Sequence, residues 1–270
     1  MKIYVTCDLE GVAGVVDHRR QCQWDRDWEA PYLGQARRLA TLELNALVEG
    51  ALAGGATEVV AWDGHGNFPG GLDIELVHPA CRVAMNAGDG GPAGLDPSFG
   101  ALFQLGLHAM GLSGALSHTF SNAIEYVRIN GRDYGEIGMN ALTAGRFGVP
   151  CVFVSGDRAA AEEARALIPG IETVAVKEAL GGQSPIPGMG SGSAICLAPE
   201  RARQLIRAGA ERAMRLIDKI RPFEVEPPYV IEVRYFKEEW AASAAARPGV
   251  ERVDQLTVRS RAASLADITF

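Results

Sequence analysis

Side chains that bind divalent metals stand at the ends of three separate apolar stretches of this sequence. These side chains are Asp8, Glu10, His65 and His108. Their oxygen and nitrogen atoms form a donor set without thiolates, which suits zinc or manganese in hydrolytic sites. If the fold brings the three stretches together, we expect a metal centre at their ends.

Asp8 and Glu10 are spaced so that both can reach one ion. Residues two apart on an extended segment point to the same face, and two carboxylates that close repel unless a cation or proton lies between them. On its own, this spacing is more often a solvated acidic turn. His65, between Gly64 and Gly66, is on its own more often a loop histidine held by hydrogen bonds. Only their convergence favours a metal site.

Three of the candidate residues have both a plain and a chemical interpretation. His108 and His118 lie near apolar residues, where a buried, hydrogen-bonded histidine is common. Glu136 suits the first turn of a helix, where the helix dipole favours an acidic side chain. Together with the residues above, they extend the carboxylate and imidazole set. His18 and His78 lie in segments without a partner pattern, and we expect both to be structural or exposed.

The elements that position these residues alternate between strand and helix. The stretch 3–9 has a strand composition, 32–53 repeats apolar residues at helical spacing, and 58–62 is again strand-like. This order predicts a βαβ unit with parallel strands. The alternation continues with strands at 101–107, 151–155 and 174–176 and helices at 136–147, 158–167 and 199–220. Because ligands bind beyond the carboxyl ends of the strands in an open α/β sheet, this fold gathers the candidate ligands at one edge.

Short strands become more frequent outside this alternating region. The stretch 123–129 predicts the first strand of a hairpin, with Asn130-Gly131 as its turn, and further strands are expected at 229–236 and 255–258. We therefore predict the α/β class, with a mostly parallel sheet and flanking helices, plus a smaller C-terminal α+β lobe.

The expected division of the chain has three parts. Residues 1–180 would form the metal-binding catalytic α/β domain, and 194–270 the C-terminal α+β portion. Between them, residues 181–193 are rich in glycine, serine and proline, a composition typical of a mobile loop or linker.

The composition is that of an ordinary globular protein, with 47% hydrophobic and 22% charged residues. A net charge of −7 argues against a nucleic-acid partner, since phosphate binding calls for basic patches. No apolar stretch is long enough to predict a transmembrane helix or a signal peptide, so no membrane association is expected. Five scattered cysteines without a C-x-x-C pair indicate a reducing compartment, and we expect a cytoplasmic protein.

Five short motifs follow one another along the chain: TCDLEG at 6–11, DGH at 63–65, GLHA at 106–109, SH at 117–118 and GEIGMNA at 135–141. In this order they resemble the motifs of the zinc-dependent D-aminopeptidase family. The likeness continues through VPCVFVSGD at 149–157 and AVK at 175–177, and so covers most of the first two-thirds of the chain.

The resemblance implies an aminopeptidase that releases N-terminal D-amino acids from short peptides. The positions of the family's dinuclear zinc ligands are those of Asp8, Glu10, His65, His108 and Glu136. Asp8 would bridge the ions, and His118 stands at the position of the catalytic histidine. The resemblance also implies two Zn²⁺ per chain, with Mn²⁺ or Co²⁺ as other candidates, and a ring-like homo-oligomer described as a decamer.

The residues themselves leave other functions open. A dinuclear amidohydrolase or phosphoesterase would use the same ligands on a different bond, and a non-enzymatic metal-dependent binding or assembly protein would need no chemistry at all. His118 favours an enzyme, because a binding protein has no need of an extra histidine near the metals. Its role as nucleophile, general acid or base, or proton donor to the leaving amine stays open.

Overall fold

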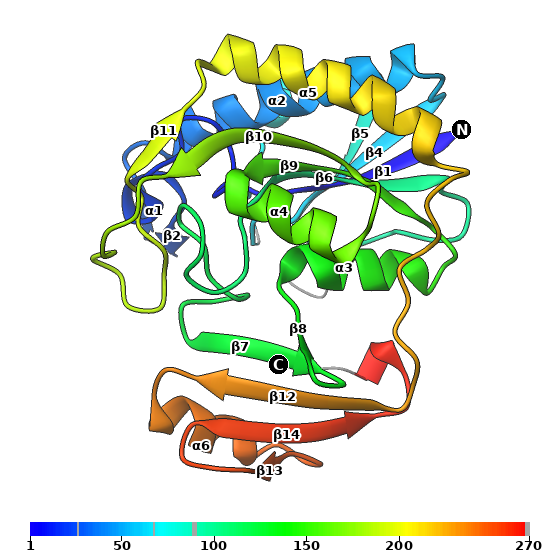
Figure 1. The fold of residues 1–270 in the computed structure, drawn as a ribbon. Coiled ribbons are helices and arrows are strands. Elements are labelled where there is room, and N and C mark those ends of the chain that lie inside the picture. The colour runs from blue at the N-terminus through cyan, green and yellow to red at the C-terminus, as the bar shows by residue number, and fades with distance from the viewer. Residues whose placement is uncertain (26, 67, 88–90, 268–270) are drawn as a thin grey trace.

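The computed structural model of the protein describes residues 1–25, 27–66, 68–87 and 91–267. A seven-stranded sheet lies between two layers of helices, and a five-stranded sheet lies beyond one of these layers (Figure 1). This is the predicted mostly parallel sheet with flanking helices and a smaller sheet region beside it.

Strand β1 (Lys2–Cys7) lies inside the large sheet, between β4 (Glu58–Asp63) and β6 (Ala101–Leu107) and parallel to both. The strand order is β11-β10-β9-β6-β1-β4-β5. The remaining strands of this sheet are β5 (Cys81–Ala84), β9 (Cys151–Asp157), β10 (Glu172–Ala179) and β11 (Ala194–Cys196). All residues of β6 and β9 are buried, because helices cover both faces of the sheet, and this accounts for their continuous apolar runs.

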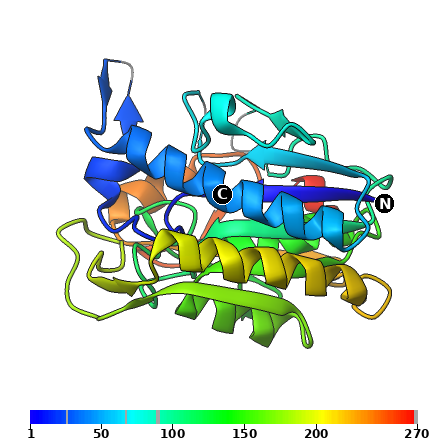
Figure 2. The same ribbon diagram turned by 90° about the horizontal axis from the view of Figure 1, so that it is seen from above.

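The helices cover the large sheet from both sides. α2 (Leu33–Ala53) and α5 (Pro199–Ala213) lie next to each other on one face (Figure 2), and α3 (Glu136–Gly145) and α4 (Arg158–Leu167) lie on the other (Figure 1). The first pair packs closely: a Cβ added at Gly50 would stand 2.1 Å from the main-chain oxygen of Arg207. The predicted helix 199–220 is shorter in the structure, because a 3₁₀ turn at Met214–Leu216 follows Ala213.

The small sheet has the order β13-β14-β12-β7-β8 and is antiparallel. Its strands are β7 (Ile124–Ile129), β8 (Arg132–Asp133), β12 (Tyr229–Tyr235), β13 (Glu251–Arg252) and β14 (Thr257–Ala262), with α6 (Glu238–Ala245) packed against them. The hairpin predicted around Asn130-Gly131 is β7–β8.

The boundary between the two sheets differs from the expected division of the chain. β7 and β8 come from the part assigned to the catalytic domain, yet they belong to the small sheet, where β7 pairs with β12 and β8 pairs with β7. α5 comes from the C-terminal part, yet it packs on the large sheet beside α2. The cause is pairing between strands far apart in sequence, in which Val127 faces Val233.

Shorter elements complete the described chain. α1 (His18–Gln21) and the hairpin of β2 (Trp24–Asp25) and β3 (Trp28–Glu29) lie between β1 and α2, and 3₁₀ turns lie at Ile74–Leu76 and Leu265–Asp267. Residues 181–193 contain no helix or strand. Among the described residues, no helix combines the length and the apolar character needed to cross a membrane.

Candidate metal centre

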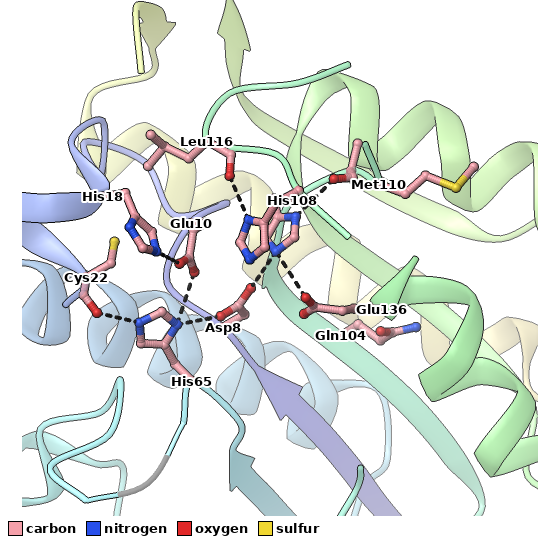
Figure 3. A network of polar contacts seen from close by, with 12 residues as sticks. Asp8, Glu10, His18, Cys22, His65, Gln104, His108, Met110, Leu116 and Glu136 are labelled. Atoms are coloured by element: carbon pink, nitrogen blue, oxygen red, sulfur yellow. Dashed lines mark hydrogen bonds and ion pairs between the residues drawn. The ribbon is translucent and has the colours of Figure 1, made fainter. Parts of the chain in front are cut away.

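The carboxyl ends of β1, β4 and β6 meet at one edge of the large sheet. In the parallel register Cys7 faces Asp63 on one side and Leu105 on the other, so the residues that follow each strand emerge together. Asp8, His65 and His108 therefore lie around a common point (Figure 3). The convergence predicted from the strand pattern is what the fold produces.

Two glycines allow the loop after β1 to lie against β6. Gly106 has a φ of +72°, and a Cβ there would stand 2.2 Å from the main-chain oxygen of Asp8. A Cβ at Gly11 would stand 2.1 Å from the main-chain oxygen of Leu107. The Gly11 amide also donates a 2.7 Å hydrogen bond to the Gly106 carbonyl. Side chains at either position would push Asp8 and Glu10 out of place.

On one side of the site, His65 faces two carboxylates. Its Nδ1 lies 2.9 Å from Asp8 Oδ1 and 3.1 Å from Glu10 Oε2. Its Nε2 lies 2.8 Å from the carbonyl oxygen of Cys22, and because that oxygen only accepts, the Nε2 hydrogen is committed to it. Nδ1 of the neutral ring then presents a lone pair to both carboxylates.

The other side repeats this arrangement around His108. Its Nδ1 donates to the carbonyl oxygen of Ala109 at 2.9 Å, and its Nε2 lies 3.4 Å from Glu136 Oε1 and 3.6 Å from Asp8 Oδ2. Glu136 is the first residue of α3. The imidazole ring of His108 is shielded from solvent, since the residue is 2% exposed. Each oxygen of Asp8 therefore faces a different histidine.

The donor set fits divalent metal ions. Asp8 Oδ2 and Glu10 Oε2 are buried and have no hydrogen-bond donor among the described residues, which is costly for carboxylate oxygens unless a cation takes their lone pairs. A histidine whose second nitrogen is fixed by a main-chain carbonyl is the usual arrangement of a metal-binding imidazole. The residues present thus suit zinc, held by Asp8, Glu10 and His65 on one side and by Asp8, His108 and Glu136 on the other.

In the absence of a metal ion, the clustered carboxylates and imidazoles of this site shift one another's pKa values. Burial opposes protonation of His65, but the neighbouring charges and hydrogen bonds of Glu10 and Asp8 outweigh it and raise the pKa of His65 well above its usual value. The pKa of His108 rises to about 10, because Glu136 and Asp8 likewise outweigh its burial. Burial and the nearby charge of Glu10 raise the pKa of Asp8 to about 7.

His118 lies beside this site on the loop that follows β6. Its Nδ1 donates to the Leu116 carbonyl oxygen at 3.0 Å, so its Nε2 carries the lone pair. Burial, and then the charge of His108, lower the pKa of His118 to about 4, which keeps the ring neutral near pH 7. The loop is held by the Gly190 amide, which donates to the Ser117 carbonyl at 2.7 Å. Residues 181–193 therefore support the loop of His118.

Comparison with known proteins agrees with this site. The sequence profile of the D-aminopeptidase family, peptidase family M55, matches residues 1–269. The chain belongs to the D-aminopeptidase family.

Two relatives give the extent of the likeness. A D-aminopeptidase of Bacillus subtilis (strain 168) is 34% identical over 258 residues, which are 93% of this chain and 87% of the relative. The solved structure of the Zn-dependent D-aminopeptidase DppA from Bacillus subtilis, described as a self-compartmentalizing protease, superposes with a TM-score of 0.86. That superposition covers 99% of this chain and 93% of the other, at 29% identity. As a D-aminopeptidase family member, the chain is a metal-dependent peptidase.

The structure also brings to the D-aminopeptidase site residues that the sequence pattern did not indicate. His18, expected to be structural or exposed, needs correction: its Nε2 lies 3.2 Å from Glu10 Oε1. Cys22 presents a ligand atom within 4.8 Å of those of Glu10 and His65. Both lie in the irregular segment between β1 and α2, where no periodic pattern marks them.

Lys177 also supports the loop after β1 that carries Glu10. It is 3% exposed, and its ammonium group donates to the main-chain oxygens of Glu10 and Val15. The AVK motif at 175–177 was the only sequence signal for this residue. Nothing in the spacing connects it with Glu10, because 167 positions separate the two.

Proposed function

We propose that this chain is a dinuclear zinc aminopeptidase that releases N-terminal D-amino acids from short peptides. One observation carries the dinuclear part: the two oxygens of Asp8 face two different histidines, each of which also faces a second carboxylate. Five oxygen and nitrogen side chains exceed what one tetrahedral zinc uses. The D-aminopeptidase names of its relatives support the substrate class.

Bound zinc would supply a Lewis acid for the peptide carbonyl and lower the pKa of a coordinated water. Asp8, Glu10, His65, His108 and Glu136 would hold the ions, and the two oxygens of Asp8 face His65 and His108. His118 would handle the proton. Its neutral Nε2 would take a proton during attack on the peptide carbonyl and give it to the leaving amine, while its Nδ1–H keeps donating to the Leu116 carbonyl oxygen.

Oligomeric assembly and compartment are also proposals. The relative DppA is described as self-compartmentalizing, which supports a homo-oligomer, and the resemblance suggests a decamer. Light scattering coupled to size exclusion should then give a mass ten times the 28.7 kDa of one chain. All five cysteines are free, which supports a reducing compartment such as the cytoplasm.

The reaction class is tested by two chromogenic assays on the same preparation. D-alanine p-nitroanilide should be hydrolysed, and p-nitrophenyl phosphate should not. The reverse result would favour a dinuclear phosphoesterase, and turnover of an N-acylated amide alone would favour an amidohydrolase. The absence of any turnover by zinc-loaded protein would contradict the enzyme.

A further inference from the structure

His18 contacts the metal centre through the carboxylate of Glu10. Its Nε2 lies 3.2 Å from Glu10 Oε1, and its side chain is 15% exposed. Glu10 Oε2 points the other way, to His65 Nδ1 at 3.1 Å. The Glu10 carboxylate is therefore held between two imidazoles, with one oxygen on each (Figure 3).

The contact of His18 is that of a hydrogen-bond donor and not of a metal ligand. Its Nε2 faces Glu10 Oε1, which is the oxygen of that carboxylate turned away from His65 Nδ1. Its Nδ1 is buried and has no hydrogen-bond partner in the described chain. The Glu10 carboxylate alone then decides the tautomer, and places the hydrogen on Nε2.

The local chain holds His18 in this position. His18 begins α1, and Asp17 caps that short helix by accepting from the Arg20 amide at 3.0 Å. The buried side chain of Gln21 accepts from the amides of Val16 and Asp17. These local hydrogen bonds hold the start of the short helix in addition to the contact with Glu10.

We propose that His18 is a positioning residue for Glu10. Its Nε2 hydrogen bond fixes the rotation of the carboxylate, so that Oε1 is occupied and Oε2 is presented beside His65 and Asp8. Mutation of a residue that hydrogen-bonds to a metal ligand typically lowers the metal affinity by roughly 10–100-fold. The inference rests on the proposed metal centre, and it confines the effect of His18 to the ion held by Glu10 and His65.

Zinc binding to the full chain, measured by competition with a chromophoric chelator, tests the proposal without using activity. His18→Leu removes the donor and should weaken one ion by roughly 10–100-fold while the other stays bound. His18→Gln keeps an N–H donor at a similar reach and should restore most of the affinity. Arg19→Gln is the matched control, because it changes an exposed neighbour on the same short helix and should match the wild type.

A second background identifies which ion responds. Glu136→Gln removes a ligand on the His108 side, so the ion that remains should become sensitive to His18→Leu. Equal zinc affinity of His18→Leu and wild type would overturn the proposal. Equal loss of both ions in His18→Leu and His18→Gln would also overturn it, because a general structural role predicts that result. A wild type that binds one ion would instead contradict the dinuclear centre, and the His18 variants would then show whether Glu10 holds that ion.

Discussion

The imidazole rings of His108 and His118 stack, with centroids 4.1 Å apart and an angle of 21° between their planes. His108 comes directly after β6 and faces Glu136 and Asp8, whereas His118 is anchored by the Leu116 carbonyl. The ligand atoms of His108, His118 and Glu136 also lie within 4.8 Å of one another. Proximity alone therefore does not separate a ligand from a proton carrier in this pair.

Alanine variants of the two histidines should separate their roles. His108→Ala removes a metal donor, so both bound zinc and activity should fall. His118→Ala should keep its zinc while the catalytic rate drops by roughly 10²–10⁴-fold, as expected for lost acid–base catalysis. Elemental analysis and turnover on both variants decide. A His118→Ala chain that loses zinc as fully as His108→Ala would make His118 a ligand.

Purified protein should carry close to two divalent ions per chain. Chelation should abolish activity, and zinc should restore it, because the buried atoms Asp8 Oδ2 and Glu10 Oε2 have no hydrogen-bond partner among the described residues. Elemental analysis before and after EDTA is the measurement. Full activity in excess EDTA, with no transition metal present, would contradict the metal centre.

Substrates should be distinguished by their amino end. Short peptides with an N-terminal D-residue and a free amine should be cleaved faster than their L-isomers or N-acetylated forms. The expectation for chirality comes from the family, and the expectation for the amine comes from its use as a metal-binding anchor. Initial rates on a matched set of D, L and acetylated dipeptides provide the test. Equal rates on acetylated and free peptides would exclude the anchor.

Glu43 should make stability depend on pH. Burial raises its pKa to about 8 from 4.5, only partly offset by the hydrogen bond from the Ala13 amide. Between these values the folded chain holds a proton that the unfolded chain releases, so the free energy of unfolding should fall as pH rises, by up to about 5 kcal/mol. Glu43→Gln keeps an acceptor for Ala13 and should flatten this dependence.

Urea unfolding at pH 5 and pH 8.5, at fixed chain and zinc concentrations, measures the effect. The variant and the wild type should differ more at the higher pH, where the variant should be the more stable. A difference that does not change with pH would show that Glu43 does not bind the proton.

Lys177 should matter for stability although it lies behind the metal centre. Lys177→Met leaves the Glu10 and Val15 carbonyls without their donor, and we expect a loss of about 1–3 kcal/mol in the free energy of unfolding. Zinc affinity should fall with it, because the loop that carries Glu10 loosens. Lys219→Met, at an exposed position, is the control and should change neither quantity. An unchanged zinc affinity in Lys177→Met would show that the contact of Lys177 with this loop does not affect how Glu10 binds zinc.

Much of the fold was predictable because its central strands are buried on both faces. The ranges expected for β6 and α4 agree with the structure, and Asp8 and His108 could be expected to lie together because each stands where a parallel strand ends. The pairing of β7 with β12 was not predictable, since a hairpin pattern does not say which sheet the hairpin joins. Glu136 joined the candidate set from its sequence position, but only the family resemblance placed it among the zinc ligands, because a first-turn glutamate is common.

His18 and Cys22 were missed for a different reason. They lie in an irregular segment whose path depends on contacts with distant parts of the chain, including the donation from Lys177 to Val15. Local sequence patterns carry no information about such contacts. The AVK motif can be recognised in the sequence, but the contacts of Lys177 with Glu10 and Val15 cannot.

The central place of β1 has a consequence for the order in which the chain is made. β1 leaves the ribosome before β4 and β6, so its partners are complete only when residues 63 and 107 have been made. Until then its main-chain groups and apolar side chains lack their native neighbours, and parallel pairing of this kind is slow. Glu136 and Lys177 arrive later still. We therefore expect nascent chains stopped before residue 107 to be prone to aggregation, and the metal ligands to come together only after Glu136 has been synthesised.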